Sequence, residues 1–224
     1  MSPQETKIAF FDVDETLITL KSMFRFLEHH LDPEEYEIAV TYLRDRAAAG
    51  TPREETNREY YRNFIGERAT DVAASGQRWF AAEMARGGLF HDPAVAEFHR
   101  HRDAGAATVL VSGSFSACLD PIADHLGADL VLSTVPEVLD GVYTGEVSTT
   151  VIGAGKAEAA REAMAKYGAT PAECVAYGDH ASDLPLLLAV GHGVVVGDDP
   201  VLLRHADEHG WDRLPGIAIH RVEN

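Results

Sequence analysis

The stretch that decides the fold is residues 7–17, which read KIAFFDVDETL. Its first half is an apolar run that ends in a carboxylate, as expected for a strand buried on both faces of a parallel sheet. Two carboxylates, Asp12 and Asp14, follow at the end of that strand. Side chains two residues apart on an extended chain point to the same side. Both carboxylates are therefore expected to face one crevice.

Short apolar runs of the same kind recur at residues 107–111, 129–132, 174–177 and 194–196. Helical patterns lie between them, at residues 93–103, 116–126, 156–167 and 184–190. Alternating strands and helices of this size predict parallel βαβ units. We expect an α/β fold with a Rossmann-like parallel sheet of five or more strands. Its ligands are expected at the carboxyl ends of the strands.

Residues 20–88 interrupt this alternation, because their apolar residues follow helical spacing only. This segment predicts a helical domain inserted after the first strand, with residues 1–19 and 89–224 forming the α/β core. Residues 136–146 hold Asp140-Gly141 between apolar residues, which predicts a β-hairpin. The aromatic residues of the insert are expected to form mostly its core, with one or two of them facing the crevice; they include Tyr42, Tyr60, Tyr61 and Trp79.

Composition narrows the possible partners. The chain has 224 residues, 46% of them hydrophobic, which is enough for a sizeable core. Its 36 acidic and 19 basic residues give a formal net charge of −17, which argues against a nucleic-acid partner. No apolar run is long enough to span a membrane, and the first residues do not resemble a signal peptide. We predict a cytoplasmic protein whose cysteines, Cys118 and Cys174, are reduced and buried.

The paired carboxylates of Asp12 and Asp14 suit phosphoryl chemistry. A carboxylate is anionic at neutral pH and can attack phosphorus to form an aspartyl-phosphate. The repulsion between the two anions must be screened, so an oxygen-ligated Mg²⁺ is expected. The second carboxylate can then serve as acid and base. The alternative is that both are ordinary loop and cap residues.

Ser112 and Gly113 follow a predicted strand and precede a helix. A hydroxyl and free backbone N–H groups at a helix start can bind an anion. Further along, Gly153-Ala154-Gly155-Lys156 opens another helix. It is not a nucleotide-binding P-loop, because Thr150 and Ala157 replace its required Gly and Ser/Thr. Lys156 can still stabilise phosphoryl charge. A plain serine cap and a surface lysine remain the alternatives.

The last motif is Gly178-Asp179, followed by a second carboxylate at Asp183. Two carboxylates that reach a crevice from one loop suit a hard divalent cation. Asp183 can also cap the helix that begins at Leu184-Pro185.

In this order, the four motifs resemble the haloacid dehalogenase (HAD) superfamily. Its phosphatases carry Asp-x-Asp-x-Thr, a Ser or Thr after a strand, a Lys, and Gly-Asp-x-x-x-Asp. The helical insert resembles the C1 cap of this superfamily. The Asp-Gly-x-Tyr-Thr-Gly hairpin at residues 140–145 resembles the phosphoserine-phosphatase-like branch, subfamily IB.

The resemblance implies a role for each matched residue. Asp12 is implied as nucleophile and Mg²⁺ ligand, and Asp14 as acid and base that also gives the metal its backbone carbonyl. Thr16 is implied to orient this loop. Asp179 is implied as a metal ligand, with Asp183 holding the metal's waters.

On the same basis, Ser112 and the Gly113 N–H are implied to hold the phosphate, and Lys156 to bridge nucleophile and phosphate. The implied activity is Mg²⁺-dependent hydrolysis of a small phosphorylated metabolite through an aspartyl-phosphate.

One position departs from the phosphoserine phosphatases. They place a Glu nine residues after the nucleophile, where it can pair with the substrate's ammonium, and Lys21 stands there in this chain. A misplaced like charge in a partly desolvated pocket costs several kcal/mol, roughly. Phosphoserine is therefore disfavoured as substrate. Ser182 replaces the usual Asn, and His180 in the same loop is a third candidate for substrate specificity.

Several alternatives stay open. A phosphotransferase of the same fold would deliver the phosphoryl group to another alcohol. A signalling receiver domain, which is a non-catalytic phospho-acceptor, is about half this length and lacks the helical insert and the Gly-Asp-x-x-x-Asp loop. A non-catalytic binding protein would be expected to have lost at least one of four residues that are all present here: Asp12, Asp14, Lys156 and Asp179. His205 and His209 lie four residues apart in HADEH, which is not HExxH because Ala206 occupies the Glu position, so structural or solvent-facing roles are expected. The oligomeric state is left open.

Overall fold

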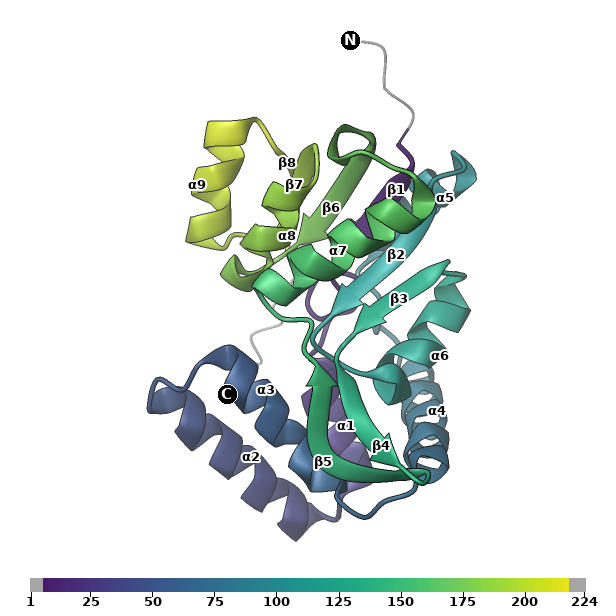
Figure 1. Ribbon diagram of the computed structural model, residues 1–224, viewed down its shortest axis with the longest axis vertical. Coiled ribbons are helices and arrows are strands. Elements are labelled where there is room, and N and C mark those ends of the chain that lie inside the picture. The colour runs from purple at the N-terminus through teal and green to yellow at the C-terminus, as the bar shows by residue number, and fades with distance from the viewer. Residues whose placement is uncertain (1–5, 218–224) are drawn as a thin grey trace.

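A six-stranded parallel sheet lies at the centre of the protein (Figure 1), in the order β3-β2-β1-β6-β7-β8. The computed structural model describes residues 6–217. The strands are β1 (Ile8–Phe11), β2 (Ala107–Ser112), β3 (Leu130–Ser133), β6 (Cys174–Gly178), β7 (His192–Val196) and β8 (Asp212–Leu214). Every neighbouring pair is parallel, which confirms the predicted α/β fold.

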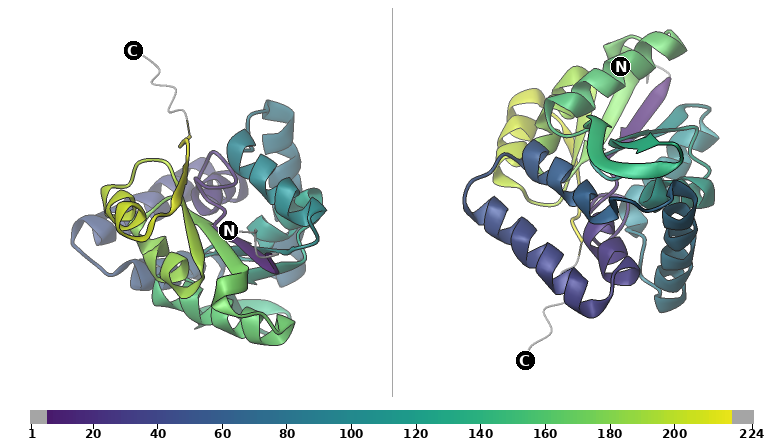
Figure 2. Two further views of the ribbon diagram at one scale, coloured as in Figure 1. Left: turned by 90° about the horizontal axis from the view of Figure 1, so that it is seen from above. Right: turned by 60° about the horizontal axis from the view of Figure 1, so that its bottom comes forward.

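Helices cover both faces of this sheet (Figure 2). On one face, Phe11 of β1 packs in a cluster with Phe98 and Ile122. These two residues belong to α5 (Asp92–Asp103) and α6 (Ser116–Leu126). On the other face, Phe10 packs in a cluster with residues of α7 (Ala154–Tyr167), α8 (Leu184–Ala189) and α9 (Pro200–His209). Strand β1 therefore has no polar face, because its alternate side chains enter two cores.

The segment between β1 and α5 is helical, as predicted. It contains α1 (Ser22–His30), α2 (Pro33–Ala48), α3 (Arg53–Tyr60), the 3₁₀ turn η1 (Tyr61–Phe64) and α4 (Ala69–Arg86). Helix α2 begins where the Asp32 carboxylate accepts hydrogen bonds from the backbone N–H groups of Glu34 and Glu35. Figure 1 shows α1, α2 and α3 beyond the carboxyl ends of the strands.

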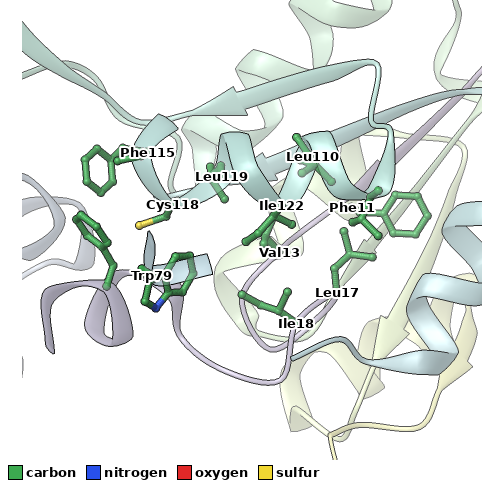
Figure 3. Close-up of a cluster of buried hydrophobic side chains, with 14 of the residues drawn as sticks. Phe11, Val13, Leu17, Ile18, Trp79, Leu110, Phe115, Cys118, Leu119 and Ile122 are labelled. Carbon is green, nitrogen blue, oxygen red and sulfur yellow. The ribbon is translucent and has the colours of Figure 1, made fainter. Parts of the chain in front are cut away.

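The helical segment shares a core with the sheet (Figure 3). Trp79 of α4 and Cys118 of α6 lie in one apolar cluster with Phe11 and with Val13 of the following loop. The prediction of a core role is confirmed for Tyr60, Tyr61 and Trp79, which are all buried. It is wrong for Tyr42, whose side chain on the outer side of α2 is 46% exposed.

The predicted hairpin is present. It consists of β4 (Val135–Leu139) and β5 (Val142–Thr149), which pair antiparallel. Asp140 and Gly141 at its tip have φ angles of 51° and 80°, the left-handed conformation that a tight hairpin turn requires. The backbone N–H of Gly66 donates to the carbonyl of Tyr143 at 3.0 Å, which joins the hairpin to the end of η1.

Cys118 and Cys174 are free and buried. Among residues 6–217, no helix is both long enough and apolar enough to cross a bilayer.

Candidate active site

A cavity of about 330 Å³ opens at the carboxyl ends of β1, β2 and β6. Every residue singled out from the sequence for catalysis, phosphate, metal or substrate specificity lines it: Asp12, Asp14, Lys21, Ser112, Gly113, Lys156, Asp179, His180, Ser182 and Asp183. These residues come from five separate parts of the chain. The sheet brings them together because the ends of parallel strands meet at one edge.

The carboxylate of Asp12 lies at the bottom of this cavity. Its backbone N–H donates to the carbonyl of Tyr177 at 3.0 Å, which extends the pairing of β1 with β6 by one residue. The side chain is only 8% exposed. Burial raises the pKa of Asp12, and the nearby Lys156 opposes this shift. A carboxylate so poorly solvated depends on its neighbours to remain ionised.

Asp14 lies beside the first turn of α1, and its carboxylate accepts a hydrogen bond from the backbone N–H of Ser22 at 3.0 Å. Burial, together with the charge of Asp12, raises the pKa of Asp14 to about 7. Near neutral pH the group therefore exists in both protonation states, as an acid–base residue needs.

Lys156 joins two of the carboxylates. Its Nζ lies 2.5 Å from Asp12 Oδ1 and 2.6 Å from Asp183 Oδ1. Burial alone would lower the pKa of this ammonium, but Asp12 and Asp183 raise it well above its ordinary value. The charge is therefore fixed. The preceding Gly155 is required for packing, since a Cβ there would lie 2.4 Å from the carbonyl oxygen of Thr150.

The loop after β6 supplies the other two carboxylates. Thr16 Oγ1 donates to Asp179 Oδ1 at 3.0 Å and more weakly to Asp12 Oδ2 at 3.4 Å. Asp183 packs against Gly178, where a Cβ would lie 2.7 Å from the Asp183 Cβ. In the Gly-Asp-x-x-x-Asp motif, Gly178 is therefore required by its close packing against Asp183, and Asp179 is positioned by its hydrogen bond from Thr16.

Oxygen atoms of Asp12, Asp179 and Asp183 all lie within 4.8 Å of one another. Burial, followed by the charges of Asp12 and Asp183, raises the pKa of Asp179 to about 8. Carboxylates that repel one another in this way fit a hard divalent cation, which would neutralise them. The carboxylate of Asp14 does not belong to this group. Binding of the metal by the backbone carbonyl of Asp14 stays a prediction.

Ser112 ends β2 in a loop held by two side chains of the helical segment. The carbonyl of Gly113 accepts hydrogen bonds from Asn57 Nδ2 at 2.8 Å and from Tyr61 Oη at 3.1 Å. The other end of that peptide group, the N–H of Ser114, donates to Ser112 Oγ at 3.1 Å. One acceptor position of Ser112 is thereby occupied, which leaves its proton free to donate into the cavity.

The three candidates for substrate specificity, Lys21, His180 and Ser182, all line the cavity. Lys21 is half-exposed, and its Nζ is 3.3 Å from Glu15 Oε2. His180 and Ser182 contact Arg53 of α3, whose Nη1 lies 2.8 Å from His180 Nδ1 and 3.1 Å from Ser182 Oγ. Burial and the charge of Arg53 lower the pKa of His180. An uncharged His180 can accept the hydrogen bond from Arg53.

Sequence reasoning missed Arg53 and Asn57, and it singled out Tyr61 only as one of the aromatic residues of the insert. All three face the cavity or its loops from α3 and η1, and their partners lie 52 to 129 residues away along the chain. Their spacing of four residues, which places them on one helix face, was the available signal. His205 and His209 lie on α9 and do not line this cavity.

Known proteins are similar to this chain in both sequence and fold. The family model described as haloacid dehalogenase-like hydrolase matches residues 9–188. A probable phosphatase of Mycobacterium tuberculosis is 31% identical over 95% of this chain and 76% of its own length. A Streptomyces azureus protein named for inhibition of morphological differentiation is 40% identical, over 59% of this chain. The match spans only 47% of that relative, about half its length.

Among solved structures, a phospho-aspartyl intermediate analogue of phosphoserine phosphatase superposes with a TM-score of 0.67. It is 21% identical, with 91% of this chain and 92% of that chain covered. An acidic crevice at the edge of such a sheet, together with these relatives, defines an enzyme of the phosphatase class. The chain belongs to the haloacid dehalogenase-like hydrolase family, and its sequence is similar to phosphoserine phosphatases within it.

Proposed function

We propose that the protein is a Mg²⁺-dependent phosphomonoesterase that works in two steps through an aspartyl-phosphate on Asp12. One observation carries this proposal: the buried Asp12 carboxylate contacts the Lys156 ammonium and lies within 4.8 Å of carboxylate oxygens of Asp179 and Asp183. Mg²⁺ would be held by Asp12, Asp179 and the Asp14 carbonyl, with Asp183 holding its waters, and it would screen the charge of the incoming phosphate.

In the first step, a carboxylate oxygen of Asp12 attacks phosphorus, and the bond from phosphorus to the ester oxygen breaks. Asp14 gives its proton to the departing alkoxide. Because its pKa is about 7, Asp14 is protonated in a fraction of the molecules at neutral pH. Ser112 Oγ and the Gly113 N–H donate to the phosphoryl oxygens, and Lys156 holds Asp12 and the phosphate in line.

In the second step, water attacks phosphorus of the aspartyl-phosphate. Asp14 accepts the proton of this water, phosphate leaves, and the Asp12 carboxylate is restored. A phosphotransferase would differ only here, because another alcohol would replace the water. A non-catalytic phospho-acceptor is disfavoured, since Asp12, Asp14, Lys156 and Asp179 all line the one cavity.

We infer that residues 20–88 act as a cap over a core formed by residues 1–19 and 89–224, and that the cap selects the substrate. The contacts of Arg53, Asn57 and Tyr61 with core loops support this division. The insert holds 10 basic and 12 acidic residues against 9 and 24 in the rest of the chain, so it is nearly neutral and better suited to an anion. We expect a small phosphorylated metabolite in a cytoplasmic protein.

Lys21 argues against phosphoserine as that metabolite. Its ammonium lines the cavity where a substrate ammonium would be repelled, and Met23, Phe24 and Leu43 add apolar surface nearby. We expect sugar or other ammonium-free phosphates to be preferred over phosphoserine and other amino-alcohol phosphates. In Lys21→Glu, kcat/KM for the amino-alcohol phosphates should rise relative to the others. An unchanged substrate profile would show that Lys21 does not contact the substrate.

The proposed activity is tested by phosphate release from p-nitrophenyl phosphate. The wild type should turn over in Mg²⁺ and stop after chelation, and Asp12→Asn should have no activity. Asp45→Asn, a matched change on an exposed position of α2, should keep wild-type activity. A folded wild type without turnover would refute the enzyme, and an active Asp12→Asn would refute the nucleophile.

A further inference from the structure

The end of α9 carries a second group of metal-ligating side chains. His205, Glu208 and His209 occupy positions i, i+3 and i+4, which share one face of a helix. One ligand atom from each side chain lies within 4.8 Å of the other two. The order His-x-x-Glu-His also occurs in helices that hold zinc through both histidines. It is a different arrangement from HExxH.

The surroundings of His205 Nδ1 suit a bound cation. This atom is buried and finds no hydrogen-bond partner within residues 6–217. It lies 3.5 Å from Glu208 Oε2. Two ligands that each bind Zn²⁺ at about 2.0–2.2 Å in a tetrahedral site are separated by roughly 3.4 Å. The distance between these two atoms therefore suits a shared cation.

The rings of the site are ordered by stacking. The His205 and His209 rings are nearly parallel, with centroids 5.9 Å apart and an interplanar angle of 11°. His209 stacks in turn on Trp211, at 5.2 Å and 21°. Trp211 is held against β7, because a Cβ on Gly193 would lie 2.7 Å from its indole ring. Both imidazoles thus lie in restricted positions on a rigid element, which lowers the cost of ordering them around a metal.

The group is separate from the active site. None of its residues lines the cavity at the strand ends. Figure 1 shows α9 in the upper part of the molecule and α1, α2 and α3 in its lower part. The ligand chemistry also differs, because the active-site group offers only carboxylate oxygens whereas this one offers two imidazoles and one carboxylate.

We propose that His205, Glu208 and His209 form a surface site for a divalent transition cation, represented by Zn²⁺, with water as the fourth ligand. Imidazole ligands favour Zn²⁺, Ni²⁺ and Cu²⁺ over Mg²⁺, which prefers oxygen. The bound cation fixes the last turn of α9 against Trp211 and so stabilises the edge of the sheet at β7 and β8. This site does not depend on the proposed phosphatase mechanism.

The test uses Trp211 as a reporter in the full, tag-free chain. Trp79→Phe leaves Trp211 as the only tryptophan, and metal-free protein is titrated with Ni²⁺ in excess Mg²⁺. The Trp211 fluorescence should fall in a saturable manner, and Zn²⁺ should compete with Ni²⁺ and restore the signal. His205→Gln and His209→Gln should each raise the Ni²⁺ midpoint about tenfold or more.

His192→Gln is the matched control, because His192 is a nearby exposed histidine whose Nε2 pairs with Asp212 Oδ2 at 2.9 Å. Its Ni²⁺ midpoint should equal that of the parent. Equilibrium dialysis against Zn²⁺ with native Trp79 covers the case in which Trp79→Phe fails to fold. The wild type should bind one Zn²⁺ per chain more than His205→Gln/His209→Gln. Equal binding, or equal Ni²⁺ midpoints in all variants, would overturn the site, whatever the phosphatase assay shows.

Discussion

At the scale of single residues, the candidate active site consists of buried charged side chains that contact one another. Lys156 carries the one basic group in direct contact with Asp12 and Asp183 among the described residues. Asp179 is held instead by the neutral Thr16 hydroxyl. An unscreened group of carboxylates is unfavourable in a buried site. The residues therefore fit a cation and an anionic substrate better than they fit a purely structural role.

The hydroxyl of Tyr61 should matter for phosphate binding through Ser112. Tyr61→Phe removes one of the two donors to the Gly113 carbonyl, a loss of about 1 kcal/mol or roughly fivefold in affinity. We expect the inhibition constant for inorganic phosphate and the KM for p-nitrophenyl phosphate to rise by about that factor, with kcat changed less. Steady-state kinetics with phosphate as inhibitor measures both constants.

Tyr60→Phe provides the matched control. Tyr60 also lines the cavity, but its hydroxyl donates to the carbonyl of Met23 at 2.8 Å and not to the loop at residues 112–114. Equal effects of Tyr60→Phe and Tyr61→Phe on phosphate inhibition would contradict a specific role for Tyr61.

The residues at strand ends could be predicted from sequence, because each of Asp12, Ser112 and Asp179 follows a short apolar run that identifies its own place in the sheet. The spacing of Arg53, Asn57 and Tyr61 indicates a shared helix face, but their roles could not be predicted, because these depend on how the helical segment docks on the core. In the sequence, Arg53 resembles a surface residue and Tyr61 a core residue.

At the scale of elements, the close contact of α4 with α6 fixes the helical segment on the core. Gly76 of α4 packs directly on the α6 backbone, where a Cβ would lie 1.8 Å from the Ala117 carbonyl oxygen. The backbone of α6 cannot move aside easily, because its own side chains lie in the apolar cluster of Figure 3.

Gly76→Ala should therefore lower the free energy of unfolding by about 2 kcal/mol or more, as expected for overpacking at a backbone contact. This loss is expected although alanine favours helix more than glycine by about 1 kcal/mol. Denaturation in urea measures it. Gln77→Ala, on the exposed side of the same helix, should change stability by less than about 0.5 kcal/mol. A Gly76→Ala protein as stable as the wild type would contradict this packing.

Most elements were predictable, because their apolar periodicity was strong. Helix α6 has the predicted bounds, 116–126. Strand β8 was missed, since Asp212 and Arg213 make up two of its three residues and give no apolar pattern. This segment forms a strand because it pairs with β7, although its own sequence has no apolar pattern.

At the scale of the whole molecule, Mg²⁺ binding should couple stability to pH. The pKa of Asp179 is raised to about 8 in the folded, metal-free protein, above its ordinary value of 3.8. Its contribution to stability is therefore present at low pH and is lost as pH rises through about 8. Mg²⁺ binds the ionised form, so the increase in Tm that Mg²⁺ causes should be largest above about pH 8 and should shrink toward pH 6.

Thermal unfolding with and without Mg²⁺ across this pH range measures the effect. Asp179→Asn should remove most of the Mg²⁺-dependent increase in Tm at every pH. An increase that does not vary with pH in the wild type would contradict the coupling between Asp179 and the metal.

The proposed mechanism requires that Asp12 becomes phosphorylated during turnover. The most direct measurement is to quench steady-state turnover in acid and to search the peptides for a phosphoryl group by mass spectrometry. We expect an acid-stable, base-labile phosphoryl group on the peptide that contains Asp12, absent without substrate and absent in Asp12→Asn. Rapid turnover with the phosphoryl group on another residue would contradict it.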